Sequence, residues 1–228
     1  EYMPRDPADV RAKEEYLRSG QVPWTYALSK GLSSAIRDPW LLLIMNMPGP
    51  LGYKLRQLWF SRKVASMGKG VVIDRNINIP ELSNLYLDDF CYLGWGLSLY
   101  APEGYVRIGK RCHIAGWILG HEGVEIGDYV ASGGMLLSVS DSHQGGFRMS
   151  GPMIPMEQRS LKRGKIVIEK DAFIGQQSIV MPGVRVGEGA VVAPFSLVVR
   201  DVRPWTVVSG VPAVKLGTRD PVRFPDPD

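Results

Sequence analysis

The sequence predicts a mainly β protein in which short strands coil around a triangular core, preceded by a helical N-terminal region. An aliphatic residue returns every six positions within residues 179–199, IVMPGVRVGEGAVVAPFSLVV, a spacing that neither a helix period of about 3.6 nor a strand period of 2 produces. The repeating positions are Val180, Val186, Val192 and Val198. The 228-residue chain also contains 26 Gly and 17 Pro, and this composition favours short strands joined by many turns.

Residues 1–69 are expected to form the helical region. Residues 8–20, ADVRAKEEYLRSG, combine charges with helix-compatible spacing, and Gly20 is a suitable helix stop. From Gly70 onward, glycine, valine and isoleucine dominate and the six-residue spacing begins. We therefore divide the chain into a helical region at 1–69, a repeat domain at 70–219 and a C-terminal tail at 220–228.

Residues 49–67, GPLGYKLRQLWFSRKVASM, would give a helix with an apolar stripe flanked by positive charge. Such a helix suits two places. It could cap the open end of the coil, which we favour slightly, or it could lie on an anionic membrane surface. The longest apolar run, residues 40–47, is far shorter than the roughly 20 residues that a membrane-spanning helix needs.

The repeat domain aligns as five copies of a three-hexad unit, and each hexad is interpreted as one side of a triangular coil. The copies start at Leu87, Ile108, Ile126, Ile168 and Val186, continue at Leu93, Ile114, Ser132, Ile174 and Val192, and end at Leu99, Gly120, Ser138, Val180 and Val198. Successive starts are separated by 21, 18, 42 and 18 residues, so the third unit carries an insertion, which we place at residues 144–165. Stacked copies would bury a continuous aliphatic column, with coils about 4.8 Å apart.

Two segments of the repeat domain resemble the hexapeptide-repeat acyltransferases, in the branch that O-acetylates sugars and polysaccharides. Residues 166–219 follow the closing pattern of that family, and SDSH at residues 140–143 resembles its catalytic segment. The resemblance covers about residues 70–219. It implies a left-handed parallel β-helix, a homotrimer, and acetyl-coenzyme A as the donor, with no metal.

His143 is the candidate general base. Counted from Ser138, it is the sixth residue of a third-side hexad, so we expect it at a corner of the coil, just before the insertion. In the family the catalytic histidine projects from such a corner, and imidazole has a pKa suited to taking a proton from a hydroxyl near neutral pH. Asp141 could orient the ring, and Glu157, in the insertion, is a second candidate for that role.

The family pattern also implies where the donor binds. The matching positions are Gly175, Gln176, Ala193, Pro194, Val199, Arg200, Lys215 and Arg219. Pro194 departs from the family's small residues and has no N–H to donate. The basic residue that follows the closing motif is displaced to Lys215. For the acceptor, His113 at another corner and His121 near a chain excursion are candidate contacts.

The remaining composition narrows location and partners. Cys91 and Cys112 fall at equivalent hexad positions, so they should stack inside the column without chemistry, which fits a reducing compartment. No secretory leader pattern opens the chain. The net charge of +4 is mild, and no basic run interleaved with aromatics indicates a nucleic-acid partner. We expect a cytoplasmic protein, in peripheral contact with the inner face of the membrane if residues 49–67 bind lipid.

Three functions are compatible with these residues. The one we favour is an acetyl-coenzyme A-dependent O-acetyltransferase acting on a saccharide or a polysaccharide precursor. An N-acetyltransferase of an amino sugar, including a nucleotide-linked one, would share the fold, the histidine and the donor. A trimeric β-helix that binds or scaffolds without catalysis belongs to a different class.

Overall fold

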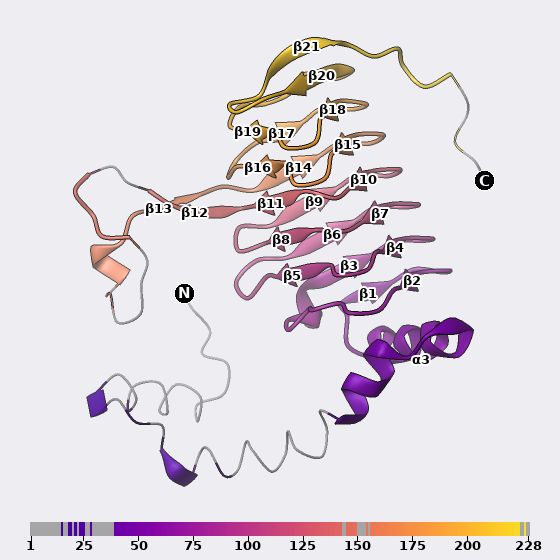
Figure 1. The fold of residues 1–228 in the computed structure, drawn as a ribbon, viewed down its shortest axis with the longest axis vertical. Helices are drawn as coiled ribbons and strands as arrows, with labels where there is room; N and C mark the ends of the chain where they lie inside the picture. Colours follow the sequence, from indigo (N-terminus) through magenta and orange to yellow (C-terminus); the bar gives the residue numbers. More distant parts are fainter. Residues whose placement is uncertain are drawn as a thin grey trace.

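The chain forms a tall β-helix standing on a short helix, with one long arm projecting from its side (Figure 1). It is a computed structural model. The described residues are 39–142, 145–149, 154, 156–223 and 226, with Glu15, Arg18, Ser19, Gln21, Pro23, Trp24, Thr25 and Leu28.

Three parallel sheets form the three sides of the β-helix, because each coil adds one short strand to each sheet. The first sheet contains β1 Ser66–Met67, β3 Leu85–Leu87, β6 Val106–Ile108, β9 Val124–Ile126, β14 Ile166–Ile168 and β17 Arg185–Val186. The second contains β2 Val72–Ile73, β4 Tyr92–Leu93, β7 His113–Ile114, β10 Ala131–Ser132, β15 Phe173–Ile174, β18 Val191–Val192, β20 Thr206–Ser209 and β21 Val214–Thr218. The third contains β5 Ser98–Tyr100, β8 Trp117–Leu119, β11 Met135–Leu137, β16 Ile179–Val180 and β19 Leu197–Val198.

The predicted aliphatic columns fill the core. Leu87, Ile108, Ile126, Ile168 and Val186 are all at most 3% exposed, as the first hexad column requires. Burying a side chain of this size stabilises a fold by about 1.5–3 kcal/mol. Cys91 and Cys112 are buried at equivalent positions of adjacent coils, as predicted.

The third column was predicted in the wrong register for two coils. Ile118 and Leu136, rather than Gly120 and Ser138, align with Leu99 across the third sheet. The corner between the second and third sheets is two residues shorter in these coils, since Ile114 and Ile118 are four residues apart whereas Leu93 and Leu99 are six apart. In the coil that starts at Ile108 the chain recovers the two residues at the next corner, so the 18-residue spacing to Ile126 is kept, whereas in the coil that starts at Ile126 the next corner carries the arm.

Helix α3, Gly49–Ser61, closes the base of the coil stack. It turns Gly52, Arg56 and Phe60 toward the coils, and all three are buried. The Arg56 guanidinium donates hydrogen bonds to the carbonyl oxygens of Ile73 at 2.8 Å, Ile44 at 3.0 Å and Met47 at 2.8 Å. The carbonyl of Ile73 at the exposed end of the coil thereby finds a partner, and the other two carbonyls belong to the chain just before α3, so Arg56 joins that chain and the helix to the coil.

The other end of the stack is closed by β20 and β21, which pair antiparallel as the last two strands of the second sheet. Two short 3-10 helices, Leu82–Asn84 and Met156–Gln158, lie outside the three sheets, and residues 39–46 are helical as well. Among the described residues, no helix is both long and apolar enough to span a membrane.

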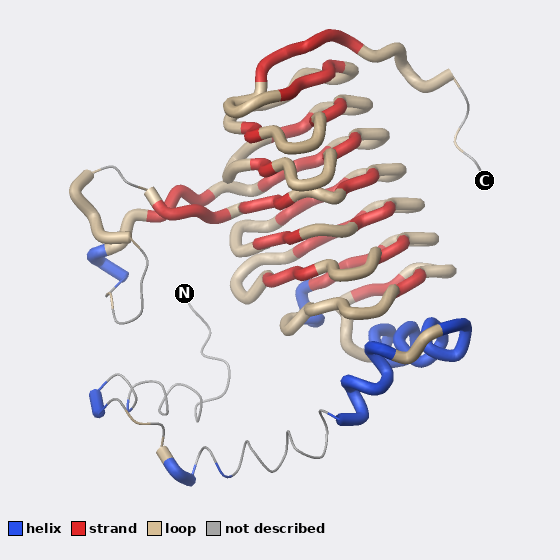
Figure 2. Tube along the Cα trace, viewed as in Figure 1, coloured by secondary structure: helices blue, strands red, loops and turns tan. Residues whose placement is uncertain are grey.

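The arm is built on β12 Val139–Asp141 and β13 Leu161–Arg163, which pair antiparallel and belong to none of the three sheets. Figure 2 shows the two strands crossing side by side where they leave the coil stack. The arm therefore begins at Val139, between the third sheet and the first, five positions before the expected start of the insertion at residue 144.

Candidate active site at the arm

The neck of the arm is fixed by Ser138, whose side chain is fully buried between two coils. The Ser138 hydroxyl donates to the Leu119 carbonyl at 2.7 Å and accepts from the Glu122 N–H at 3.0 Å. The Ser138 carbonyl in turn accepts from the Gly164 N–H at 3.0 Å, where the chain returns. The Ser138 side chain thus ties the outgoing end of the arm to the coil below, and the Ser138 backbone carbonyl ties the returning end to the outgoing end.

The SDSH segment runs out along the arm. Ser140 and Asp141 belong to β12, and the Ser142 N–H donates to the Ser160 carbonyl at 2.7 Å across the arm. Asp141 is exposed. His143 lies outside the described residues. Because Ser138 is not in the third column and the chain has left the coil by Val139, the hexad count that placed His143 at a coil corner does not hold.

Glu157 also lies in the arm, in the 3-10 helix Met156–Gln158, and it is exposed. The structure therefore places both candidate orienters, Asp141 and Glu157, on the segment that carries SDSH.

An ion-pair cluster ties the arm to the coils beneath it. The Arg163 guanidinium lies 3.1 Å from a Glu103 carboxylate oxygen and 2.7 Å from one of Glu122. Two residues on, the Lys165 ammonium lies 2.7 Å from the Glu125 carboxylate, which also accepts from the Tyr105 hydroxyl at 2.7 Å. Arg163 and Lys165 lie on the chain that returns from the arm, whereas the carboxylates lie on the coils. The cluster therefore fixes the direction in which the arm leaves the coil stack.

Of the two histidines that the structure describes, His121 is the one beside this cluster, at the corner between the third and first sheets. Its ring contacts the Tyr100 ring edge-on at a centroid distance of 5.4 Å, and its Nδ1 is buried without a hydrogen-bond partner among the described residues. Burial lowers the pKa of His121, opposed by the nearby Glu103 and Glu122 carboxylates. A neutral imidazole at this corner can accept or donate a proton at neutral pH.

His113 does not lie at a corner, contrary to expectation. It is the outward residue of β7 on the second sheet, exposed, with its ring edge-on to Tyr92 at 4.7 Å. The Tyr92 hydroxyl donates to the Asp74 carboxylate at 2.7 Å. His113 and His121 therefore belong to different sides of one subunit.

The predicted donor positions are distributed over three corners. Gly175, Gln176, Ala193 and Pro194 stack in two consecutive coils at the corner between the second and third sheets. Val199 and Arg200 follow β19 at the corner from which the arm leaves lower down, and both are exposed. One subunit thus brings Gly175, Gln176, Ala193 and Pro194 together at one corner. It places Val199 and Arg200 together at another.

Gly175 is required by the close approach of these two coils. A Cβ atom at Gly175 would lie 2.4 Å from the Pro194 nitrogen, closer than real Cβ contacts allow. The Gly175 and Ala193 N–H groups donate within the second sheet, to Val192 and Val208. Gln176 is exposed at the tip of the corner, where its side-chain amide is available to a ligand.

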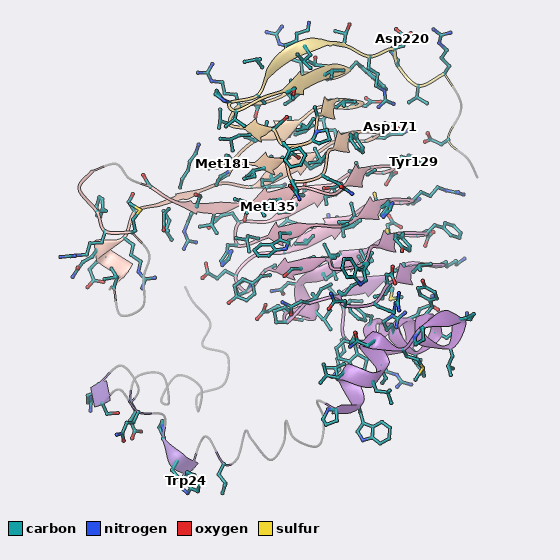
Figure 3. The ribbon with its side chains drawn as sticks, viewed as in Figure 1. Trp24, Tyr129, Met135, Asp171, Met181 and Asp220 are labelled. Atoms are coloured by element: carbon teal, nitrogen blue, oxygen red, sulfur yellow. The ribbon has the colours of Figure 1, made fainter. Side chains whose placement is uncertain are left out.

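Lys215 lies on β21 and is exposed, and Arg219 directly follows that strand. Arg219 is half-buried, with its guanidinium 5.6 Å from the centre of the Trp205 ring and 3.4 Å from the Asp171 carbonyl. Arg219 thus sits at the corner between the first and second sheets. Figure 3 labels Asp171 and Tyr129 on that edge, across the stack from the arm.

The sequence reasoning missed the Arg163 cluster. A signal for part of it existed, because Glu103 and Glu122 each follow a third-sheet strand in adjacent coils, which puts them at one corner. The described part of the chain contains no group of three or more His, Cys, Asp or Glu side chains placed to hold a metal ion.

Comparison with known proteins agrees with this architecture. A family profile described as "Bacterial transferase hexapeptide (six repeats)" matches residues 165–200. The chain is 34% identical over 145 residues to the dTDP-4-amino-4,6-dideoxy-D-glucose acyltransferase of Escherichia coli, covering 62% of this chain and 72% of that protein. It is 32% identical over 142 residues to a putative lipopolysaccharide biosynthesis O-acetyl transferase of Escherichia coli K12, covering 60% of this chain and 66% of the relative.

A solved structure is also similar, that of the N-acyltransferase AntD from Bacillus cereus in complex with dTDP and 3-hydroxybutyryl-CoA. The match has a TM-score of 0.62 at 25% identity and covers 72% of this chain and 88% of AntD. The predicted fold, a left-handed parallel β-helix with a helical N-terminal extension, is confirmed.

Proposed function

Because this chain belongs to the hexapeptide-repeat acyltransferases, whose acyl donor is a coenzyme A thioester, we propose that it transfers an acetyl group from acetyl-coenzyme A to a hydroxyl of a saccharide or polysaccharide precursor. One observation carries the proposal: the chain leaves a hexapeptide β-helix in an arm that carries Ser140, Asp141 and Ser142, and His143 is the next residue in the sequence. The relative that is named as an O-acetyl transferase supports a hydroxyl acceptor.

In this mechanism His143 takes the proton from the acceptor hydroxyl while the oxygen attacks the thioester carbonyl. The new C–O bond forms, the C–S bond breaks, and the proton passes to the leaving coenzyme A sulfur. Asp141 or Glu157, on the same arm, orients the imidazole. His121 lies at the corner where the arm leaves, so it is the acceptor contact we favour, whereas His113 would reach the acceptor from a neighbouring subunit.

We propose that the donor lies along the corner of Gly175, Gln176, Ala193 and Pro194, with Val199 and Arg200 contacting it from another subunit. Lys215 and Arg219 are the candidate phosphate contacts, since charge-assisted hydrogen bonds to phosphate are strong. A homotrimer would supply such a shared site. The outer face of the third sheet, which carries Trp117, Met135, Ile179 and Leu197, is the apolar surface we propose it buries.

Coenzyme A thioesters are cytoplasmic metabolites, so we place the reaction in the cytoplasm, at the inner face of the membrane when the acceptor is lipid-linked. A reaction at the inner face of the membrane does not require the chain to cross the membrane.

The test is a screen of sugars with acetyl-coenzyme A that follows release of free thiol. We expect turnover with a hydroxyl acceptor, and His143→Ala should lower kcat by about 10²- to 10⁴-fold, the range for a lost general base. The variant should keep its circular dichroism spectrum and its affinity for coenzyme A, and free imidazole should restore part of the rate.

Retention of more than about a tenth of the turnover by His143→Ala would remove His143 as the base. The screen includes amino sugars, free and nucleotide-linked, so exclusive turnover with an amine would replace O-transfer by N-transfer. Coenzyme A binding without turnover on any acceptor would favour the scaffold function.

A further inference from the structure

The base of the molecule presents an apolar and positively charged surface that the capping role leaves unused. We define the basal surface by eight exposed apolar and basic residues of the segment 39–63: Trp40, Leu42, Leu43, Leu51, Lys54, Leu58, Arg62 and Lys63. On α3 the capping residues Gly52, Arg56 and Phe60 follow one another every four positions along one side. With 100° per residue, Leu51, Lys54 and Leu58 fall on the opposite side, away from the coils.

The apolar residues of this surface are unusually open to solvent. Trp40 is 67% exposed, Leu42 62%, Leu51 63% and Leu58 50%. Phe60 is 1% exposed and Arg56 is fully buried, so these residues close the β-helix. The exposed leucines are therefore not needed for that role. Large apolar side chains gathered in one place on a protein surface mark an interaction site.

The charge of the segment restricts what can bind there. Residues 39–73 contain no Asp or Glu, and their basic residues are Lys54, Arg56, Arg62, Lys63 and Lys69. Arg56 is buried and the Lys69 backbone N–H donates to the Asp89 carboxylate, so the basal surface itself carries three exposed positive charges, Lys54, Arg62 and Lys63. An identical surface on a second copy would be repelled, whereas an anionic surface would be attracted.

We infer that the basal surface binds an anionic phospholipid membrane, with Trp40 and the exposed leucines entering the headgroup region and the lysines and arginine contacting lipid phosphates. This combination of an apolar side, flanking cations and a tryptophan is typical of helices that lie in the membrane interface. In a trimer whose subunits stand parallel, all three basal surfaces would face the same way and bind together, which multiplies a weak affinity.

The inference rests on the proposed function only for its purpose, which is to hold the active site near a lipid-linked acceptor. The membrane contact itself is independent of the chemistry. Its test therefore measures binding, using the full chain, and needs no acceptor.

The experiment is co-sedimentation with vesicles of phosphatidylcholine alone or of phosphatidylcholine with phosphatidylglycerol. We expect binding to the anionic vesicles only, weakened by salt. The triple variant Lys54→Glu, Arg62→Glu, Lys63→Glu should bind at least about tenfold more weakly, since each cation near an anionic surface contributes. Leu51→Ser with Leu58→Ser should also weaken binding, without changing the surface charge.

A matched control separates location from net charge. Arg107→Glu, Lys110→Glu, Arg185→Glu makes the same charge change on exposed residues at the side of the stack, and it should keep the wild-type affinity for vesicles. Equal loss in both triple variants, or no vesicle binding by the wild type, would overturn the inference. So would a mass above that of the trimer that the basal substitutions abolish, because the surface would then join copies of the chain.

The two proposals can fail separately. Vesicle binding by a protein whose His143→Ala variant keeps its turnover would leave the membrane contact standing without the proposed chemistry. Acetylation of a soluble sugar by a protein that does not bind vesicles would leave the proposed chemistry standing without the membrane contact.

Discussion

At the scale of single residues, burial decides which nucleophiles the chain can use. The Cys91 thiol donates to the Gly109 carbonyl at 2.9 Å and the Cys112 thiol to the Gly127 carbonyl at 3.0 Å, both inside the core. Burial raises the pKa of Cys91 to about 11 and that of Cys112 to about 12. Both are therefore protonated at neutral pH and act as small apolar side chains.

Neither thiol should react with a chromogenic disulfide reagent in the native protein at pH 8, where a free cysteine is partly thiolate. We expect modification at least about a hundredfold slower than that of free cysteine, and complete modification of both once guanidinium unfolds the chain. The variant Lys110→Cys, exposed at the same corner, serves as the positive control and should react at once. Fast loss of both native thiols would contradict the buried column.

At the scale of elements, the six-residue spacing predicted strands better than corners. The first column was right throughout, because each member is a buried aliphatic that opens a coil. In two coils a corner is two residues shorter, and Gly120 and Ser138 were assigned to the column because they follow the second-column residues by six positions. Spacing revealed the insertion but not the antiparallel strands at its base, because that pairing joins residues across a segment with no repeat.

The Arg163 cluster is the element-scale feature whose role can be measured. Arg163→Ala should lower kcat by about tenfold to a hundredfold, since small displacements of a catalytic group are costly. The free energy of unfolding should fall by less than about 1 kcal/mol, because all three side chains are roughly a third exposed and such ion pairs are weak. The KM for acetyl-coenzyme A should stay constant.

Two variants make that measurement specific to the arm. Arg163→Lys retains the charge and should recover part of kcat. Arg185→Ala removes an ion pair with Glu169 on the first sheet, away from the arm, and should leave kcat unchanged. A loss of activity that simply follows thermal stability across the three variants would reduce Arg163 to a structural residue.

At the scale of the whole molecule, the three sides of the β-helix differ in what they can contact. The first sheet turns Arg107, Glu125 and Arg185 outward, as a solvated surface would. The third turns Trp117, Leu119, Met135 and Leu137 outward, and Trp117 is 55% exposed. Both ends of the stack are occupied, by α3 and by β21, so a sideways contact through the third sheet is the association that the apolar surface favours.

Ile179→Lys should therefore dissociate the proposed homotrimer, because it places a charge between Met135 and Leu197 on the outer face of the third sheet. Light scattering should show the mass fall from three chains to one, while circular dichroism shows the β-helix intact, since Ile179 points away from the core. If the cleft is shared between subunits, dissociation should also lower the rate of acetyl transfer. Val167→Lys makes the same change between Glu125 and Arg185 on the first sheet and should remain trimeric. A trimer that survives Ile179→Lys would move the interface to another side of the β-helix, and a wild-type monomer at working concentrations would remove the shared cleft.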